Sequence, residues 1–462
     1  MTSLRLSFDR GTLRVDGEPD ALGLEYVRFD PRTGFHRAPA SRYGAILTRA
    51  QERALGIDDR VSPDVLVSPT PVQAQTLRPY QEQALTSFDA FGKQGIIVLP
   101  TGSGKTRVAC AALARAACSA LILVPTRALL EQWVAVLRTV HPGPIGVVGD
   151  GELQIEPITV MTFESAYRRL DVHGSKFAML IVDEVHHFAG GLRSEGLEMC
   201  VAPIRLGLTA TPPTRGSLAA ERLRGLVGPV VCELAIEDLT GRHLAELDVV
   251  RIHVALEPDE REQYLRDHEP FDELRREIRR VHQDADWKTC VALIARMNGG
   301  RDILAAEQRA AALATFPRAK RRVVQDLAAR HWQDRTLLFT ATADQAYSLG
   351  TDLLVPVITA ETTRQEREDI LDRFRRGVVR MICSARVLNE GIDVPEANVA
   401  IIAGGALGAR EHIQRIGRIL RPAEGKRATA YEIVTIDTMD EMRTRAWRRP
   451  SAAGPPAVTR TH

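Results

Sequence analysis

The stretch Leu99-Pro-Thr-Gly-Ser-Gly-Lys-Thr106 follows an apolar run and opens a helical pattern. Glycines in such a loop let backbone N–H groups surround phosphate oxygens, and the Lys-Thr pair adds an ammonium and a hydroxyl. The strict pattern has a glycine where Leu99 stands, but the strand–loop–helix order is kept. We therefore predict an ATP site in which Lys105 reaches the β- and γ-phosphates and Thr106 ligates Mg²⁺. The residues expected around the nucleotide are Thr101, Gly102, Ser103, Gly104, Lys105 and Thr106.

Outward from this loop, short apolar runs alternate with helical stretches in two separate sets. The first set comprises residues 96–99, 121–124, 158–161, 180–182 and 205–208, and the second comprises 336–340, 357–359, 380–384, 399–403 and 431–436. Runs of this length that are separated by helices are typical of parallel sheets buried on both faces. The sequence thus predicts an α/β protein with two parallel-sheet domains.

The remaining segments differ in character, and they set the expected domain boundaries. Residues 1–68 form a small α/β module that ends in a proline-spaced linker, and residues 72–240 form the first parallel-sheet domain. The second domain is expected at 241–445. Within it, residues 257–314 are rich in charge and lack a strand pattern, which predicts a helical insertion. A disordered tail is expected at 446–462.

Composition narrows the class of protein only a little. The chain has 462 residues, 44% hydrophobic and 26% charged, with a formal net charge of +2, so any nucleic-acid surface must be a local patch. The six cysteines show no metal-ligand spacing. The first ten residues are charged where a signal peptide would be apolar, and the apolar stretch 108–124 is broken by Arg115. We expect no membrane segment and a reducing, cytoplasmic location at the nucleoid.

An acidic motif, Asp183-Glu-Val-His186, directly follows the run at 180–182. A carboxylate at the end of a parallel strand faces the edge where ligands bind. Asp183 is predicted to hold the metal and Glu184 to orient and deprotonate the attacking water. A solvated acidic strand end is the alternative. The neighbouring His186 and His187 lack the spacing of a His-Glu-x-x-His zinc site.

A basic motif, Gln414-Arg-Ile-Gly-Arg-Ile-Leu-Arg421, lies in the second half. On a helix, Arg418 and Arg421 would share one face, because residues three apart are neighbours. Two guanidinium groups there suit an arginine finger for the γ-phosphate. An exposed basic helix is the equally weighted alternative.

Six motifs occur in the order found in superfamily 2 helicases: 77–81, the loop at Lys105, 183–186, 209–211, 389–394 and 414–421. Finer matches at Ala38-Pro-Ala40, at 183–187 and at 241–247 resemble the archaeal and bacterial XPB helicases. The resemblance runs from about residue 5 to about residue 447. It implies two RecA-like domains, a damage-recognition-like front module and a thumb-like insertion at 257–314. A plain helical spacer is the alternative for the insertion.

The resemblance also implies roles for individual residues. Gln81, aided by Arg78, would read the adenine. Thr209 and Thr211 would couple the state of the nucleotide to domain closure. Gly391 and Asp393 would line the ATP cleft, which Gln414, Arg418 and Arg421 complete. Residues implied to contact DNA phosphates are Thr126, Arg127, Thr162 and Ser384.

Two stretches bear on what the motor does with DNA. XPB helicases carry an Arg-Glu-Asp triplet after Thr-Ala-Thr, whereas this chain reads Pro212-Pro-Thr-Arg-Gly216; an Arg367-Glu-Asp369 occurs in the other half. In the front module, arginines alternate with aromatic residues between positions 26 and 53. Arg37 and Arg42 are therefore predicted to clamp DNA phosphates, with an arginine-rich solvated face as the alternative.

The function expected from these observations is an ATP- and Mg²⁺-dependent DNA helicase or translocase. By the resemblance it would track DNA 3′ to 5′ and unwind or remodel it in repair. Its expected substrates are single-stranded tails and forked or bubble duplexes, with a repair nuclease as a candidate partner. Two alternatives stay open, namely a duplex translocase and an ATP-gated damage-binding clamp that does not separate strands. A nuclease is disfavoured because Glu424-x-Lys426 lacks an upstream acidic partner.

Overall fold

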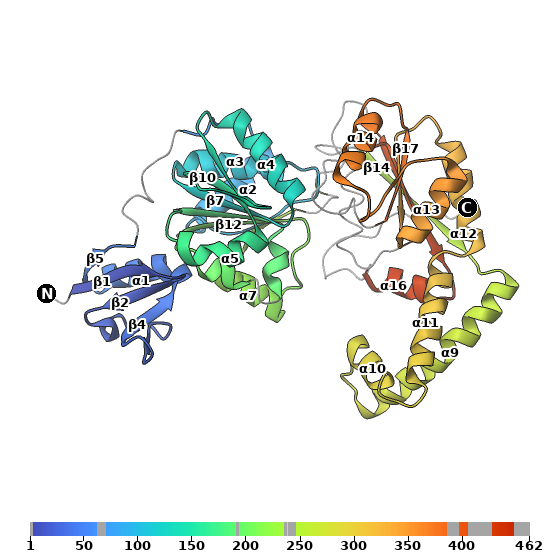
Figure 1. The fold of residues 1–462 in the computed structure, drawn as a ribbon, viewed down its shortest axis with the longest axis horizontal. Helices are drawn as coiled ribbons and strands as arrows, with labels where there is room; N and C mark the ends of the chain where they lie inside the picture. The colour runs from blue at the N-terminus through green and yellow to red at the C-terminus, as the bar shows by residue number, and fades with distance from the viewer. Residues whose placement is uncertain are drawn as a thin grey trace. The chain divides into compact units, whose positions relative to one another are not determined.

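The computed structural model describes residues 3–61, 71–190, 194–234, 238, 246–385, 397–404 and 427–447. The chain separates into two compact units, the first reaching Leu239 and the second starting at Thr240 (Figure 1). Each unit is described by itself. The first contains a small sheet and a large one, and the second contains one large sheet with a helical extension.

The small N-terminal sheet has five strands in the order β3-β4-β2-β1-β5. Its elements are β1 (Ser3–Asp9), β2 (Thr12–Asp16), η1 (Pro19–Leu22), β3 (Arg28–Asp30), β4 (Phe35–Pro39), η2 (Ala40–Arg42), α1 (Tyr43–Glu52) and β5 (Gly56–Asp59). All neighbours are antiparallel except β1 and β5. Alternate residues of β1 and β2, such as Leu4 and Leu13, form a core with Ile46 of α1. One helix therefore covers one face of this sheet.

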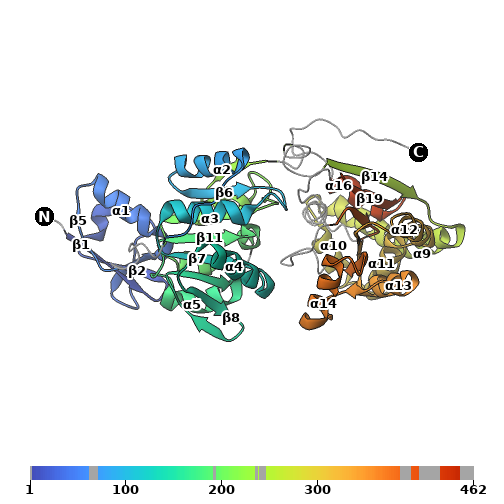
Figure 2. The same ribbon diagram turned by 90° about the horizontal axis from the view of Figure 1, so that it is seen from above.

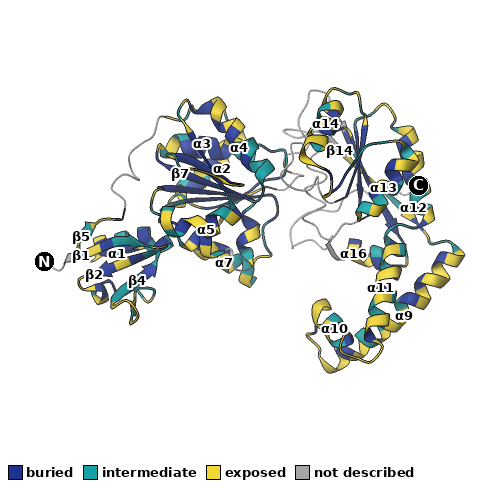
Figure 3. Cartoon of the chain, in the orientation of Figure 1, coloured by how far each residue is buried: buried dark blue, intermediate teal, exposed yellow. Residues whose placement is uncertain are grey.

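The large sheet of the first unit has eight strands in the order β13-β6-β12-β11-β7-β10-β8-β9, and only β8 and β9 pair antiparallel. Its strands are β6 (Gln94–Val98), β7 (Ala120–Val124), β8 (Ile145–Gly149), β9 (Glu152–Gln154), β10 (Ile158–Thr162), β11 (Met179–Asp183), β12 (Ile204–Thr209) and β13 (Val230–Glu233). β7 and β11 are buried along their whole length (Figure 3). This burial explains their uninterrupted apolar sequences.

Helices cover both faces of the eight-stranded sheet (Figure 2). They are α2 (Pro79–Ala90), α3 (Lys105–Ala116), α4 (Arg127–Val140), α5 (Phe163–His173), α6 (Glu195–Glu198) and α7 (Leu218–Leu226), with η3 (Val185–Ala189) after β11. Side chains of α5, α6 and α7 share one core cluster with alternate strand residues such as Leu121 and Leu180. Several helices begin directly after a strand with a side-chain cap, as at Thr126 and Thr162.

The second unit is built on a six-stranded parallel sheet in the order β14-β19-β18-β15-β17-β16. Its strands are β14 (Glu246–Val254), β15 (Thr336–Thr340), β16 (Val357–Ile358), β17 (Met381–Ala385), β18 (Val399–Ile402) and β19 (Arg427–Thr435). α12 (Arg318–Arg330) and α13 (Ala343–Leu353) pack with Leu338 and Ile401 in one cluster. α14 (Arg364–Arg375) precedes β17.

A helical extension lies between β14 and α12 (Figure 1). It consists of α9 (Pro258–Val281), α10 (Trp287–Ile294) and α11 (Gly300–Thr315). The extension contacts the last described helix, α16 (Met439–Trp447): the Tyr264 hydroxyl accepts a hydrogen bond from the Met439 N–H at 3.1 Å, and both side chains pack in a cluster with Ala310. The extension is thereby tied to the second sheet through α16.

The predicted fold class is confirmed: there are two parallel sheets, a small N-terminal mixed sheet and a long helical insertion. In the two large sheets, β8, β9, β13 and β14 were not among the predicted strands, because their sequences lack a long apolar run. The expected disordered tail, 446–462, lies almost wholly outside the described residues. Within the described part of the chain, no helix is both long and apolar enough to cross a membrane.

Candidate active site and strand-contact edge

The phosphate loop joins β6 to α3, as the sequence predicts. Gly102 and Gly104 have φ angles of 83° and 81°, a left-handed conformation that side chains with a Cβ rarely adopt. Gly104 then caps α3, so the N-terminus of this helix faces the loop. Lys105 Nζ donates to the Leu99 carbonyl at 3.3 Å and so folds back over the loop. Leu99 itself is fully buried and serves the core at the position where the strict pattern has glycine.

α2 holds this loop from behind. The Gln81 amide accepts from the Arg78 N–H at 2.9 Å and donates to the Ser103 carbonyl at 2.8 Å, while the Tyr80 hydroxyl donates to the same carbonyl at 2.6 Å. A Cβ at Gly104 would lie 2.6 Å from Gln81 Nε2, so any other residue here would displace the Gln81 amide from this contact. The Gln81 amide has a second N–H and further lone pairs. Adenine reading by Gln81 and Arg78 stays a prediction.

The acidic motif sits at the end of β11. Asp183 Oδ1 accepts from the Glu184 N–H at 3.0 Å, and Oδ2 accepts from Trp133 Nε1 on α4 at 2.9 Å. Burial raises the pKa of the Asp183 carboxyl, while the Lys105 charge, the Trp133 indole and the Glu184 N–H oppose that rise. Glu184 occupies a left-handed conformation (φ 50°) that turns the chain into η3.

This acidic turn is connected to the Thr209-Ala-Thr211 motif at the end of the neighbouring strand, β12. His186 Nδ1 lies 2.9 Å from Thr209 Oγ1, and the same oxygen accepts from the Thr211 N–H at 3.0 Å. His186 and Thr209 are both buried. The loop is also bound to this strand, because the Leu99 N–H donates to the Thr209 carbonyl at 3.0 Å. Thr209 thus contacts both the acidic turn and the start of the glycine-rich loop.

Three of the predicted DNA contacts lie together on the same sheet. Thr162 pairs with Val124 in the register of β10 and β7, and Thr126 follows two residues after that. Thr126 caps α4 and Thr162 caps α5, each through its hydroxyl oxygen. Arg127 donates to Glu131, to the Gly149 carbonyl and to Glu152. Two capped helix N-termini therefore lie at the ends of neighbouring β-strands. Arg127, at the start of α4, is held by its bonds to Glu131 of the same helix and to Glu152 of β9.

The second unit contributes fewer described site residues. Ser384 is fully buried in β17, and its hydroxyl has no hydrogen-bond partner within the described ranges. Gly391, Asp393, Gln414, Arg418 and Arg421 lie outside the described residues, so their roles remain predictions.

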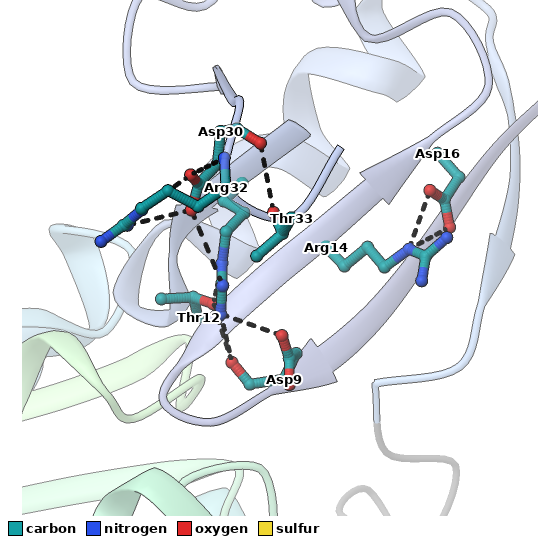
Figure 4. Close-up of polar contacts among 8 residues, drawn as sticks. Asp9, Thr12, Arg14, Asp16, Asp30, Arg32 and Thr33 are labelled. Atoms are coloured by element: carbon teal, nitrogen blue, oxygen red, sulfur yellow. Dashed lines mark hydrogen bonds and ion pairs between the residues drawn. The ribbon is translucent and has the colours of Figure 1, made fainter. Parts of the chain in front are cut away.

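The front module separates its two predicted DNA-binding arginines. Arg37 donates to Asp9 Oδ2 at 2.9 Å and to Thr12 Oγ1, and a second carboxylate, on Asp30, lies 3.9 Å away. Asp30 also pairs with Arg32, as Figure 4 shows. Arg42 has no carboxylate partner in the described module and lies with its guanidinium carbon 5.2 Å from the Tyr26 ring centroid. Of the two predicted residues, only Arg42 therefore has no carboxylate partner among the residues that the structure describes.

The aromatic residues interleaved with these arginines are arranged differently from one another. The Phe35 ring lies under the Arg14 guanidinium, 4.4 Å from its carbon to the ring centroid. Phe29 is 56% exposed and meets His36 edge-on at 5.4 Å. An exposed ring of this kind offers a face to an unstacked base, whereas Phe35 is occupied.

The segment after Thr211 is a turn in which Arg215 pairs with Glu233 at 2.5 Å. The Arg367-Glu-Asp369 sequence lies on α14, where Arg367 donates to the Thr362 carbonyl and Glu368 pairs with Arg364. These contacts are local to the second unit. The Arg-Glu-Asp sequence is thus part of a helix of the second unit, whereas the Thr-Ala-Thr motif starts at the last residue of β12 in the first.

The sequence did not predict that Tyr80 and Trp133 contact the candidate nucleotide site. It also did not predict that His186, in the acidic motif, contacts Thr209. Tyr80 adjoins a predicted residue, so its position could have been noted. Trp133 sits in the apolar stripe of α4 with Leu130, Val134 and Leu137, where spacing indicates only core packing. Within the described ranges, no group of three or more His, Cys, Asp or Glu side chains could hold a metal.

These features define an ATP-dependent motor of helicase superfamily 2, and three family profiles match along the chain. The "Xeroderma pigmentosum group B helicase damage recognition domain" matches residues 6–61, the "Type III restriction enzyme, res subunit" 74–214, and the "Helicase conserved C-terminal domain" 319–423. The chain is 34% identical over 413 residues to the "DNA 3'-5' translocase XPB2" of Sulfurisphaera tokodaii, covering 88% of this chain and 92% of the relative. The chain belongs to the XPB family of DNA helicases and translocases.

A second relative and a solved structure are also similar, the structure in its fold. The chain is 32% identical over 378 residues to the "DNA 3'-5' helicase XPB" of Mycobacterium tuberculosis, covering 79% of this chain and 61% of that relative. The Pyrococcus furiosus Hef helicase domain aligns with a TM-score of 0.53 at 18% identity, over 80% of this chain and 98% of that one. The predicted family and enzyme class are confirmed: the protein is an ATP-dependent DNA helicase or translocase.

Proposed function

We propose that this chain uses ATP to move 3′ to 5′ along DNA and so opens or remodels duplexes in repair. The observation that carries the proposal is the shared sheet edge. Strands β6, β11 and β12 end at the phosphate loop, at Asp183 and at Thr209. β10 ends at the capping residue Thr162, and β7 ends two residues before the capping residue Thr126. Ligands of parallel sheets bind at this carboxyl edge. The nucleotide and the DNA strand would therefore both contact the carboxyl edge of the same sheet.

At the nucleotide end of this edge, each residue has a distinct proposed role. Lys105 neutralises the β- and γ-phosphates, and Glu184 orients and deprotonates the attacking water. Thr106 and Asp183 would hold Mg²⁺, which would neutralise charge on the phosphates. The donor set fits this ion, because a buried carboxylate and a hydroxyl are oxygen ligands and Mg²⁺ takes its remaining ligands from phosphates and water.

At the other end of this sheet edge, the helix N-termini at Thr126 and Thr162 would bind successive phosphates of one DNA strand, because their N–H groups and dipoles favour anions. Arg127 is already paired with Glu131 and Glu152, so it would contact a phosphate only by exchanging these partners. Substrates with a single-stranded tail, a fork or a bubble offer such a strand next to a duplex. These are the substrates we propose.

A second candidate function is movement along duplex DNA without strand separation. It is favoured by the segment Pro212–Gly216, in which the only charged side chain, Arg215, is paired with Glu233. The relatives carry both descriptions: that of Sulfurisphaera tokodaii is named a translocase and that of Mycobacterium tuberculosis a helicase.

The test compares ATPase rates of the full chain with single-stranded DNA, duplex, bubble DNA and RNA, with Lys105→Ala as the inactive control. Stimulation by single-stranded and bubble DNA above that by RNA is expected. Displacement of a labelled strand from a forked duplex would support strand separation, whereas displacement of only a triplex-forming strand would support duplex translocation. Equal rates with every nucleic acid and with none would contradict both.

A further inference from the structure

A tryptophan on α4, the helix whose start is proposed to contact a DNA strand, contacts the candidate nucleotide site. α4 starts at Arg127 after the Thr126 cap, and Trp133 follows about two turns later, roughly 10 Å along the helix axis. The Trp133 side chain is 2% exposed, and its Nε1–H donates to Asp183 Oδ2 at 2.9 Å. The two ends of one short helical segment therefore meet two different ligand sites.

This hydrogen bond does more than satisfy a buried donor. The other carboxylate oxygen, Oδ1, accepts from the Glu184 N–H, so the two bonds hold the two oxygens of Asp183 separately. The carboxylate plane is thereby fixed relative to β11 on one side and to α4 on the other. A phenylalanine or leucine would fill the same apolar stripe without introducing a buried N–H that needs an acceptor. The indole N–H thus orients the carboxylate as well as packing in the core.

The N-terminus of α4 is the part of this helix that would contact, and be shifted by, a bound DNA strand. Its first turn has N–H groups without intrahelical partners, of which the Thr126 hydroxyl occupies one, on Leu129. Between the first turn and the indole, Leu130 and Trp133 itself are buried and pack this part of the helix tightly against the sheet. A shift at the first turn is therefore transmitted to the indole.

We propose that Trp133 is a positioning residue that orients Asp183 and couples strand contact at the start of α4 to the ATP site. The proposal rests on the proposed function, which places DNA phosphates at Thr126 and Thr162 and a cation at Asp183. Outer groups that orient a metal-binding carboxylate govern metal affinity. By the reciprocity of linked binding, the strand and the metal-bound nucleotide would each change the affinity of the other.

The test uses Trp133→Phe, which keeps an aromatic ring but removes the indole N–H, with Leu137→Ala as a matched control on the same buried face of α4. In Trp133→Phe, the Mg²⁺ concentration that half-saturates ADP binding should rise by about tenfold or more. Stimulation of turnover by single-stranded DNA should fall, whereas DNA affinity without nucleotide should be retained. Leu137→Ala should lower thermal stability but leave both the Mg²⁺ requirement and the stimulation unchanged.

A second measurement does not depend on that variant folding. The chain has four tryptophans, so replacing Trp287, Trp332 and Trp447 with phenylalanine leaves one indole N–H signal, that of Trp133. In ¹⁵N spectra of this chain, the signal should exchange slowly with solvent. It should shift when Mg²⁺ and ADP are added, and shift separately when single-stranded DNA is added.

The outcomes separate this inference from the function beneath it. A wild-type ATPase that no DNA stimulates would overturn the proposed function and the coupling with it. A wild type that DNA does stimulate, together with a Trp133→Phe variant of unchanged stimulation and Mg²⁺ requirement, would overturn the inference alone. An indole signal that neither ligand moves would do the same.

Discussion

His186 Nδ1 lies 2.9 Å from Thr209 Oγ1, and this contact joins the turn after β11 to the end of β12. The Thr209 hydroxyl also accepts the Thr211 N–H, so one oxygen organises two motifs that are separate in the sequence. Both side chains are buried, which makes the contact sensitive to loss of either partner. A hydroxyl in this place can pass a change at Glu184 to the segment after Thr211.

Thr209→Val removes this hydroxyl while keeping the side-chain shape. We expect a loss of about 1–3 kcal/mol in the free energy of unfolding, because buried partners are left unsatisfied. DNA-stimulated turnover should fall by about tenfold or more, which corresponds to about 1.4 kcal/mol in the barrier. Thr159→Val is the matched control, since Thr159 is equally buried and bonds only to the Glu156 backbone. It should lose stability and keep the stimulation; equal kinetic loss in both variants would refute a coupling role.

Lys105→Ala and Glu184→Gln should both abolish turnover but differ in nucleotide binding. The lysine change removes the positive partner of the phosphates, so ATP affinity should fall. The glutamine change removes only the base, so ATP should stay bound and unhydrolysed. Equilibrium binding of labelled ATP measures the difference, and equal loss of binding in both variants would contradict the assigned roles.

Arg42→Ala and Arg37→Ala test the front module as a pair. Arg42 has no carboxylate partner in the described module, so its removal should weaken DNA binding and reduce the slope of log affinity against log salt by up to about one. Arg37 is bound to Asp9 and Thr12, so its removal should mainly lower the melting temperature (Figure 4 shows the surrounding network). ATPase at saturating single-stranded DNA should survive in both. A salt slope that changes with Arg37 and not with Arg42 would reverse this assignment.

Arg418 is predicted from sequence to act on the γ-phosphate. Arg418→Ala should lower turnover by on the order of 10³, the scale for an arginine finger, while nucleotide affinity falls far less. Arg418→Lys should not rescue, because an ammonium lacks the planar fork of a guanidinium. Arg373→Ala, at an exposed arginine of α14, is the control and should be neutral. Normal turnover with lost DNA binding in Arg418→Ala would assign this arginine to the strand instead.

A buried ion pair holds α16 to α12: Lys320 Nζ lies 2.9 Å from Asp440 Oδ2, and the lysine side chain is fully buried. Asp440→Ala should cost about 3–5 kcal/mol in the free energy of unfolding of the second unit, because it leaves a buried charge without a partner. Lys320→Met combined with Asp440→Leu should restore most of that loss. Denaturant titrations followed by tryptophan fluorescence measure both, and a small effect of Asp440→Ala would show that α16 is not held by this pair.

The same lysine gives a pH dependence with a definite sign. Burial lowers the pKa of Lys320 below its ordinary value of 10.5, with Asp440 opposing the shift. Between the lowered pKa and 10.5, the unfolded chain binds more protons than the folded one, so this group makes stability rise with pH in that window. Lys320→Met should remove the contribution.

Local sequence was enough to predict the two sheets and much of the nucleotide site. A few consecutive residues were enough to predict the glycine-rich loop after one apolar run and the acidic pair after another. Each motif joins a strand to a turn or a helix N-terminus, and these are local structures. Thr162 directly follows the predicted strand 158–161 and Thr126 lies two residues after the predicted strand 121–124, but only the structure shows that they cap α5 and α4.

Only the tertiary structure decided which of these side chains form hydrogen bonds or ion pairs with one another. Trp133 reads as an ordinary core residue in the stripe of α4, and its bond to Asp183 exists because β7 and β11 are neighbours in the sheet. Arg37 and Arg42 are alike in sequence, but antiparallel pairing of β2 with β4 places Arg37 near Thr12 and Asp9. Spacing along the chain fixes which chemical groups are available, whereas strand order and register determine which of them lie within hydrogen-bond distance.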